Sequence, residues 1–100
     1  MPPHPHDESV WETIDPDGRR VVLDAAGWRH VIARHDDLTL HREDLLRAVA
    51  EPTRRASGSR ENEEFFYLAE AGPSRWIKVV VHYDHGLGRI TTAFPRRRFP

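Results

Sequence analysis

The ten residues RWIKVVVHYD, at positions 75–84, are the stretch that we expect to decide the fold, because they give the strongest strand signal in the chain. Successive side chains of a strand point to opposite faces of a sheet. We predict that one face of this strand packs against helices. That face carries Ile77, Val79, Val81 and Tyr83, and the other face carries Trp76, Lys78, Val80 and His82.

The second face combines a tryptophan, a histidine and Lys78, the only lysine of the chain. An aromatic ring beside a cation is suited to stacking a nucleobase and holding a phosphate. A half-exposed strand that simply turns its polar side chains toward water has the same pattern. The strand alone therefore leaves both interpretations open.

Two further strands flank this one in the second half of the chain. FFYLAEAG at 65–72 precedes it after a polar segment that holds a turn, and RITTAFP at 89–95 follows the tight turn HGLG at 85–88. Strict alternation would put Ile90, Thr92 and Phe94 on the face toward the helices. Thr92 would then lie near the helices, where its hydroxyl could meet a histidine.

The first half begins with a predicted hairpin. VWETI at 10–14 and RRVVLD at 19–24 are two short strand-like runs, and DPDG at 15–18 between them is typical of a turn. Two amphipathic helices follow, one over about 25–36 after Asp24 as N-cap and one over 41–51 before a proline.

This order of elements predicts an α+β domain. We expect the N-terminal hairpin and two helices to pack on one face of a three- to four-stranded antiparallel sheet. Residues 1–8, with three prolines and two histidines, are predicted to be a disordered lead-in, and 9–97 a single domain.

Composition restricts the functional classes. The chain has 100 residues and a net charge of −1, with eleven acids and six bases in residues 1–51 but five acids and nine bases afterwards. A basic second half permits a phosphate-binding surface. With no cysteine, thiolate zinc sites and cysteine nucleophiles are excluded. The seven histidines show no HExxH spacing, and HGLG is a turn and not a phosphate loop, so we predict neither a metal nor a cofactor.

The sequence shows no signal peptide and no apolar stretch of membrane-spanning length. We therefore expect no membrane association. The expected location is the cytoplasm, or the chain is the C-terminal effector domain of a larger secreted protein.

Residues 27–38, GWRHVIARHDDL, hold two histidines and two arginines in the first predicted helix. On a 3.6-residue period His35 falls on the apolar stripe with Trp28, whereas His30 and Arg34 stand together on another side.

Two motifs in the chain resemble those of a known superfamily. Trp28-x-His30-Val31-x-x-Arg34-His35 and Thr92-Ala93-Phe94-Pro95 resemble the W-x-H-I-x-x-R-H and T-A-Y-P signatures of small bacterial and phage members of the barnase, colicin and RelE-like (BECR-fold) ribonuclease superfamily. The resemblance covers about residues 20–97. It implies N-terminal helices, a four-stranded antiparallel sheet and metal-independent RNA cleavage, often in toxins. Phe94 replaces the family's tyrosine, so that phenolic hydroxyl is absent.

If the chain cleaves RNA, five residues are candidates for the chemistry. A base must take the proton of a 2′-hydroxyl and an acid must protonate the leaving 5′-oxygen, and histidine suits both transfers because its ordinary pKa is about 6.5. We assign His30 as general base or acid, His35 as its partner or orienting group, and Arg34 and Lys78 as phosphate stabilisers. Thr92 would hydrogen-bond the phosphate or fix a histidine.

A second set is predicted to bind the nucleic acid around the reacting phosphate. This set comprises Arg54, Arg55, Trp76, His82 and Arg96. Each has a simpler interpretation, as a solvent-facing loop charge or as part of a basic tail that binds an acidic partner.

Two functional hypotheses follow. The first is a metal-independent endoribonuclease that acts on tRNA or mRNA, a toxin with a cognate antitoxin or immunity protein. The alternative is a non-catalytic module on the same fold that binds nucleic acid or a protein.

Overall fold

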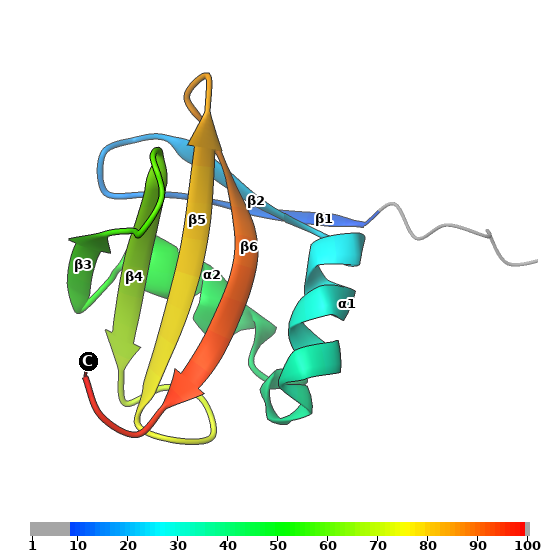
Figure 1. Cartoon of the computed structure of the whole chain (residues 1–100). Coiled ribbons are helices and arrows are strands. Elements are labelled where there is room, and N and C mark those ends of the chain that lie inside the picture. The colour runs from blue at the N-terminus through cyan, green and yellow to red at the C-terminus, as the bar shows by residue number, and fades with distance from the viewer. Residues whose placement is uncertain (1–8, 100) are drawn as a thin grey trace, which may run out of the picture.

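The computed structural model describes residues 9–99, and the predicted lead-in at 1–8 lies outside this range. Figure 1 shows one sheet with a helix behind it and a second helix beside it. The elements are β1 Val10–Ile14, β2 Arg20–Asp24, α1 Ala25–Arg34, the 3-10 helix η1 Asp36–Leu38, α2 Arg42–Ala50, β3 Arg54–Ser57, β4 Glu63–Ala69, β5 Trp76–Asp84 and β6 Leu87–Arg96. The prediction of an α+β fold is confirmed.

The predicted sheet of three to four antiparallel strands is wrong. Over residues 9–99 the sheet has six strands in the order β1-β2-β6-β5-β4-β3, and it is mixed, because β2 runs parallel to β6. The hairpin therefore extends the sheet instead of packing on its face. The polar segment 54–57 adds the other edge strand, which pairs with β4. Both the hairpin and β3 join the sheet by pairing with strands distant in the sequence or across a loop, and the residue pattern of one strand does not reveal its pairing partner.

The hairpin turn is stabilised by hydrogen bonds between a side chain of the turn and the backbone N–H groups of the turn. The carboxylate of Asp15 accepts hydrogen bonds from the backbone N–H groups of Asp17 and Arg19, each at 2.9 Å. Gly18 has a φ of +86°, a conformation that favours glycine. The turn thus fixes the register in which Val10 faces Asp24.

Helix α1 begins where β2 ends. The Asp24 side chain caps it by accepting a hydrogen bond from the Gly27 N–H at 2.7 Å. Strand β2 borders β6 only at Gly88 and Arg89, and beyond that point α1 lies beside β6 (Figure 1). The tightest contact at Gly27 is with the cap, because a Cβ there would lie 3.1 Å from Oδ1 of Asp24.

The core lies between α2 and the sheet. Helix α2 packs against β1, β4 and β5, and its Leu45 and Val49 are fully buried. The face of β5 that was predicted to be apolar meets it, since Ile77, Val79 and Val81 are fully buried too. The prediction for this strand is confirmed.

The predicted facing of the last strand is wrong, and a β-bulge is the reason. Val81 pairs with Ile90, whereas its neighbour Val80 pairs with Thr92, so Thr91 is an extra residue in β6. The bulge reverses the alternation after Ile90. Thr92 therefore lies on the face opposite α2, on which Lys78 pairs with Phe94.

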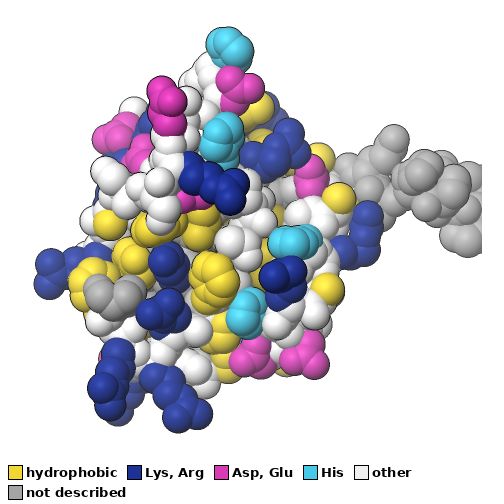
Figure 2. All heavy atoms as spheres, in the orientation of Figure 1, with side chains coloured by type: hydrophobic (Ala, Val, Ile, Leu, Met, Phe, Trp, Pro, Cys, Tyr) yellow, Lys and Arg dark blue, Asp and Glu magenta, His cyan; other side chains and the backbone are white. Residues whose placement is uncertain are grey.

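We call the face of the sheet opposite α2 the open face. Figure 2 looks onto it and shows hydrophobic side chains surrounded by basic and histidine side chains. From the strand pairing, the open face comprises Glu63, Phe65, Tyr67, Trp76, Lys78, Val80, His82, Thr92, Phe94 and Arg96.

Candidate functional site

A groove of about 610 Å³ crosses the open face, and we call it the central groove. Three strands of the sheet, helix α1 and the loop before β4 contribute to it. Its lining consists of His30, Arg34, Ser59, Arg60, Glu63, Phe65, Lys78, Val80, Thr91, Thr92 and Phe94. Four of the five predicted catalytic residues, namely His30, Arg34, Lys78 and Thr92, thus face one space.

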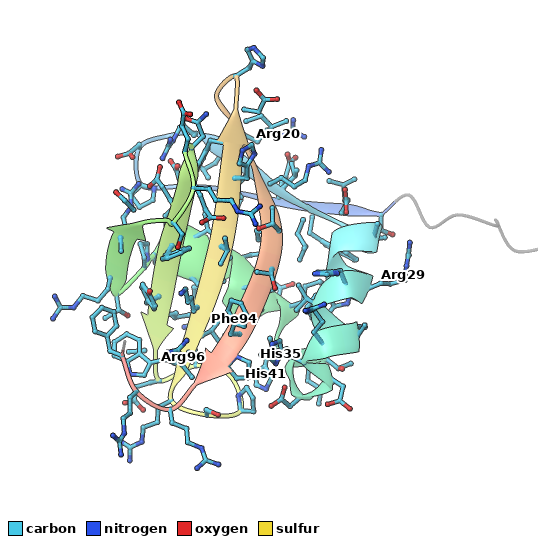
Figure 3. All side chains as sticks on the ribbon, in the orientation of Figure 1. Arg20, Arg29, His35, His41, Phe94 and Arg96 are labelled. Atoms are coloured by element: carbon cyan, nitrogen blue, oxygen red, sulfur yellow. The ribbon has the colours of Figure 1, made fainter. Side chains whose placement is uncertain are left out.

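Helix α1 supplies His30 and Arg34 from the edge of the sheet. The two residues are one helical turn apart, so their side chains lie on the same side of the helix. Both are exposed. Arg29, the preceding residue, points away from the sheet, as Figure 3 shows. The packing of Trp28 and Val31 into the core fixes this orientation of the helix.

Lys78 lies in the middle of the groove against aromatic rings. Its Nζ is 3.9 Å from the centroid of the Phe65 ring, 5.7 Å from that of Tyr67 and 5.9 Å from that of Phe94. Burial lowers the pKa of Lys78, nearby Arg96 lowers it further, and Glu63 opposes this. The ammonium is therefore held in a partly desolvated position, where a ligand phosphate would interact with it more strongly than in water.

The carboxylate of Glu63 organises the loop that closes one side of the groove. Its Oε1 accepts hydrogen bonds from the backbone N–H groups of Ser59 and Arg60, at 3.0 and 3.4 Å. The Gly58 N–H donates to the Glu63 carbonyl oxygen at 2.7 Å. A Cβ at Gly58 would lie 2.5 Å from the Glu63 side chain, so the loop needs glycine at this position.

Three groove residues, Glu63, Arg60 and Phe65, were not predicted from the sequence. Alternation in EEFFYLA places Glu63, Phe65 and Tyr67 on one face of β4, and this signal was available. The pairing of Phe65 with Val80 then places that face beside Lys78, and this pairing was not visible in the sequence.

His35 lies next to the groove but does not line it. It follows the last turn of α1, and its ring meets the edge of Phe94 with centroids 5.4 Å apart (Figure 3). His35 can therefore position the Phe94 ring, which lines the groove, but unlike His30 it does not line the groove itself.

The structure does not bring the five residues predicted to bind nucleic acid together in one place. Trp76 and Arg96 are paired across β5 and β6 on the open face. His82 lines a smaller hollow of about 210 Å³ with Asp84, Leu87, Arg89 and Thr91. The guanidinium of Arg54 lies 5.5 Å from the ring centroid of Phe99, and the Phe99 ring also contacts Trp76.

Arg55 is on the other side of the sheet, in a cluster of charges that we call the hairpin network. It donates hydrogen bonds to Asp17 and Glu64 at 2.9 and 2.7 Å, and Arg19 donates to the same Glu64 at 2.6 Å. The Asp17 carboxylate is the main cause of a raised pKa for Arg55. Arg55 is thus committed to intramolecular ion pairs.

Asp15 is the buried centre of the hairpin network. The hydroxyl of Tyr83 donates to its Oδ2 at 2.7 Å and the Nε of Arg19 donates at 2.8 Å. Burial would raise the pKa of Asp15, but these hydrogen bonds and those from the turn backbone lower it overall. Burial, followed by the hydrogen bond to Asp15, raises the pKa of Tyr83.

Within residues 9–99, no group of three or more histidine, aspartate or glutamate side chains is placed to hold a metal ion. Neither helix in that range combines the length and the apolar character needed to cross a bilayer. The groove offers an imidazole, a carboxylate, hydroxyl groups and cations, which can bind a phosphodiester and move protons.

Comparisons with protein-family models, with curated proteins and with solved structures found no match to this chain.

Proposed function

We propose that this chain is an endoribonuclease that cleaves RNA in the central groove without requiring a metal ion. The observation that carries the proposal is the convergence of His30 and Arg34 from α1, Lys78 from β5 and Thr92 from β6 on one groove. These residues are far apart in the sequence, and the fold brings a proton carrier, two cations and a hydroxyl to the same space.

The groove suits a single-stranded polynucleotide. Arg34, Arg60 and Lys78 provide positive charge for phosphates, and the rings of Phe65 and Phe94 provide surfaces on which bases can stack. The substrate class that fits is RNA with unpaired nucleotides, such as the loops of tRNA or mRNA.

The cleavage step needs two proton carriers on the groove. In our proposal Glu63 accepts the proton of the 2′-hydroxyl, and the resulting oxygen attacks the adjacent phosphorus. The bond from phosphorus to the 5′-oxygen breaks, His30 protonates that oxygen, and a 2′,3′-cyclic phosphate remains. Lys78 and Arg34 stabilise the charge of the phosphorane, and Thr92 donates a hydrogen bond to it.

The resemblance to the barnase, colicin and RelE-like superfamily supports the same activity, since residues from both motifs line the groove: His30 and Arg34 from the first, and Thr92 and Phe94 from the second. A role as a toxin with a cognate antitoxin or immunity protein belongs to this proposal.

The experiment is RNA cleavage in the presence of a chelator. Purified protein is incubated with total tRNA and with a defined oligonucleotide, and the products are examined for a 2′,3′-cyclic phosphate. We expect His30→Ala and Glu63→Gln each to lower the rate at least about 100-fold, because each removes a proton carrier. His85→Ala, which changes a histidine that is 94% exposed in the β5–β6 turn, is the matched control.

The second candidate is binding without cleavage on the same surface. Phe94 favours it, because this ring stacks on a base but has no hydroxyl to hold a phosphate. In that case wild type, His30→Ala and Glu63→Gln would all bind the oligonucleotide, and none would cleave it.

A further inference from the structure

An aromatic cluster lies on the open face beyond Lys78. Tyr67 and Trp76 are diagonal neighbours on β4 and β5, and we call them the aromatic platform. The ring of Phe99, from the segment that follows β6, covers them. Its centroid is 4.9 Å from that of Tyr67, edge to face, and 5.2 Å from that of Trp76 at a tilt of 43°.

Among the described residues, Phe99 contacts the rings of Tyr67 and Trp76 and the guanidinium of Arg54. Phe99 lies beyond the end of β6 at Arg96, and the two residues between them, Arg97 and Arg98, are exposed. Phe99 itself is 44% exposed. Tyr67 beneath it is only 4% exposed. A ring that is half in water thus covers a ring that is almost fully buried, which is a contact that another flat ring can replace.

The platform continues the central groove. The Nζ of Lys78 lies 3.9 Å from the centroid of Phe65, which lines the groove, and 5.7 Å from that of Tyr67, which belongs to the platform. Arg54 lies over the Phe99 ring at 5.5 Å, and Arg96 acts electrostatically on both Tyr67 and Lys78. Cations therefore border the platform as they border the groove.

We infer that the aromatic platform is a second nucleobase-binding site, next to the central groove, and that Phe99 occupies it until single-stranded RNA displaces the ring. Phe99 stands in for the base: it is a flat ring packed edge to face on Tyr67 and tilted on Trp76, with the guanidinium of Arg54 over it. Aromatic rings and guanidinium groups are also what holds unpaired bases. The inference rests on the proposed function for the identity of the polymer. It adds a site and a competition within the chain that the central groove does not require.

The test measures binding of an oligonucleotide that the protein cannot cleave. The probe is a fluorescent 2′-O-methyl hexanucleotide containing all four bases, and its affinity is measured by fluorescence anisotropy in chelator. We expect Phe99→Ala to bind it about fivefold more tightly than wild type, because the competing ring is gone. The slope of affinity against salt should stay the same, since no charge has been removed.

A double variant and a control identify the source of the gain. In Phe99→Ala/Trp76→Ala the gain should disappear, because the base loses the surface on which it stacks. Leu40→Ala, which removes another exposed apolar side chain (92% exposed), should bind as wild type does. Circular dichroism and thermal unfolding check that each variant is folded.

The inference is overturned if Phe99→Ala binds no more tightly than wild type, or if the gain survives the loss of Trp76. It is also overturned if no variant binds the probe, which would leave the platform to a protein partner. The proposed function is read separately, from cleavage of the unmodified hexanucleotide. Cleavage without a gain from Phe99→Ala rejects the inference alone, and a Trp76-dependent gain without cleavage rejects the ribonuclease alone.

Discussion

The hairpin network and the central groove are both rich in charge, but they use it differently. In the network Arg19 and Arg55 share the carboxylate of Glu64, and Asp15 is buried beneath them. In the groove Arg34, Arg60 and Lys78 form no ion pair within residues 9–99. The same residue types are thus neutralised on one side of the sheet and left available on the other.

This contrast separates residues that hold the fold from residues that can bind a ligand. A guanidinium that already donates to two carboxylates has few N–H donors left for a phosphate. A guanidinium without an ion pair can exchange its bound water for a phosphate. Substitutions in the network should change stability, and substitutions in the groove should change binding and cleavage.

The largest effect that we expect on stability is that of Asp15→Asn. The buried carboxylate accepts hydrogen bonds from Tyr83 and Arg19 side chains at Oδ2 and from two backbone N–H groups at Oδ1. Asparagine has one accepting oxygen, so its amide nitrogen would face donors on the other side. Breaking a buried charged pair costs about 3 kcal/mol or more in the free energy of unfolding. Urea unfolding measures it, and the folded variant should cleave RNA at the wild-type rate. A stable but inactive Asp15→Asn variant would contradict the assignment of the hairpin network to stability and of the groove to activity.

Lys78→Met should have the opposite effect, with little change in stability and a large loss of activity. Methionine fills the space among the three rings, so the free energy of unfolding should change by less than about 1 kcal/mol. The cation is lost, and we expect kcat/KM for RNA to fall about 100-fold. Lys78→Arg keeps the charge and should recover part of the activity. Wild-type cleavage by the methionine variant would remove Lys78 from the site.

A matched pair of arginines compares the two sides directly. Arg34→Ala should weaken oligonucleotide binding and reduce the slope of log affinity against log salt by about 1, with no loss of stability. Arg55→Ala should lower the free energy of unfolding by about 1 kcal/mol and leave binding unchanged. Binding isotherms at several salt concentrations and urea unfolding of both variants check this. The same behaviour in both would show that the two sides are not distinct.

The smallest effect is a dependence on pH. The folded pKa of Asp15 lies below its ordinary value of 3.8, so the ionised carboxylate stabilises the fold above that pH. Its contribution is lost as the pH falls through 3.8 toward the folded pKa. The stability difference between wild type and Asp15→Asn should therefore be constant above about pH 5 and shrink in more acidic buffer. Urea unfolding over that range measures it, and a difference that grows on acidification would have the wrong sign.

The parts of the fold that depend on local patterns were predictable from the sequence. Alternation in 75–84 correctly placed Ile77 and Val79 in the core, and the helical period placed Trp28 there and left His30 exposed. The turn DPDG correctly predicted a hairpin. In each case neighbours in the sequence determine the outcome.

The missed features depend on long-range pairing. Strand β3 is the polar stretch RRAS, and it is a strand because β4 offers it an edge. The parallel contact joins β2 to β6 across most of the chain. The bulge at Thr91 arises where β6 fits β5, and it moves Thr92 from the predicted helix side into the groove. Strict alternation cannot detect an inserted residue.

The candidate site was found in part. The sequence identified four residues of the groove, but it did not identify Glu63, which looked like one more acid in a polar segment. It also placed Arg55 with the binding residues, whereas the fold gives that side chain to Asp17 and Glu64. The number of basic residues alone does not indicate which of them are free to bind.

The most direct measurement is a crystal structure of the protein with the 2′-O-methyl hexanucleotide. Our account predicts a phosphate of the oligonucleotide in the central groove, within hydrogen-bonding distance of Lys78 Nζ and the guanidinium of Arg34, with a neighbouring base on the aromatic platform in place of Phe99. An oligonucleotide bound at the hairpin network, or along the helix side of the sheet with the groove unoccupied, would contradict it.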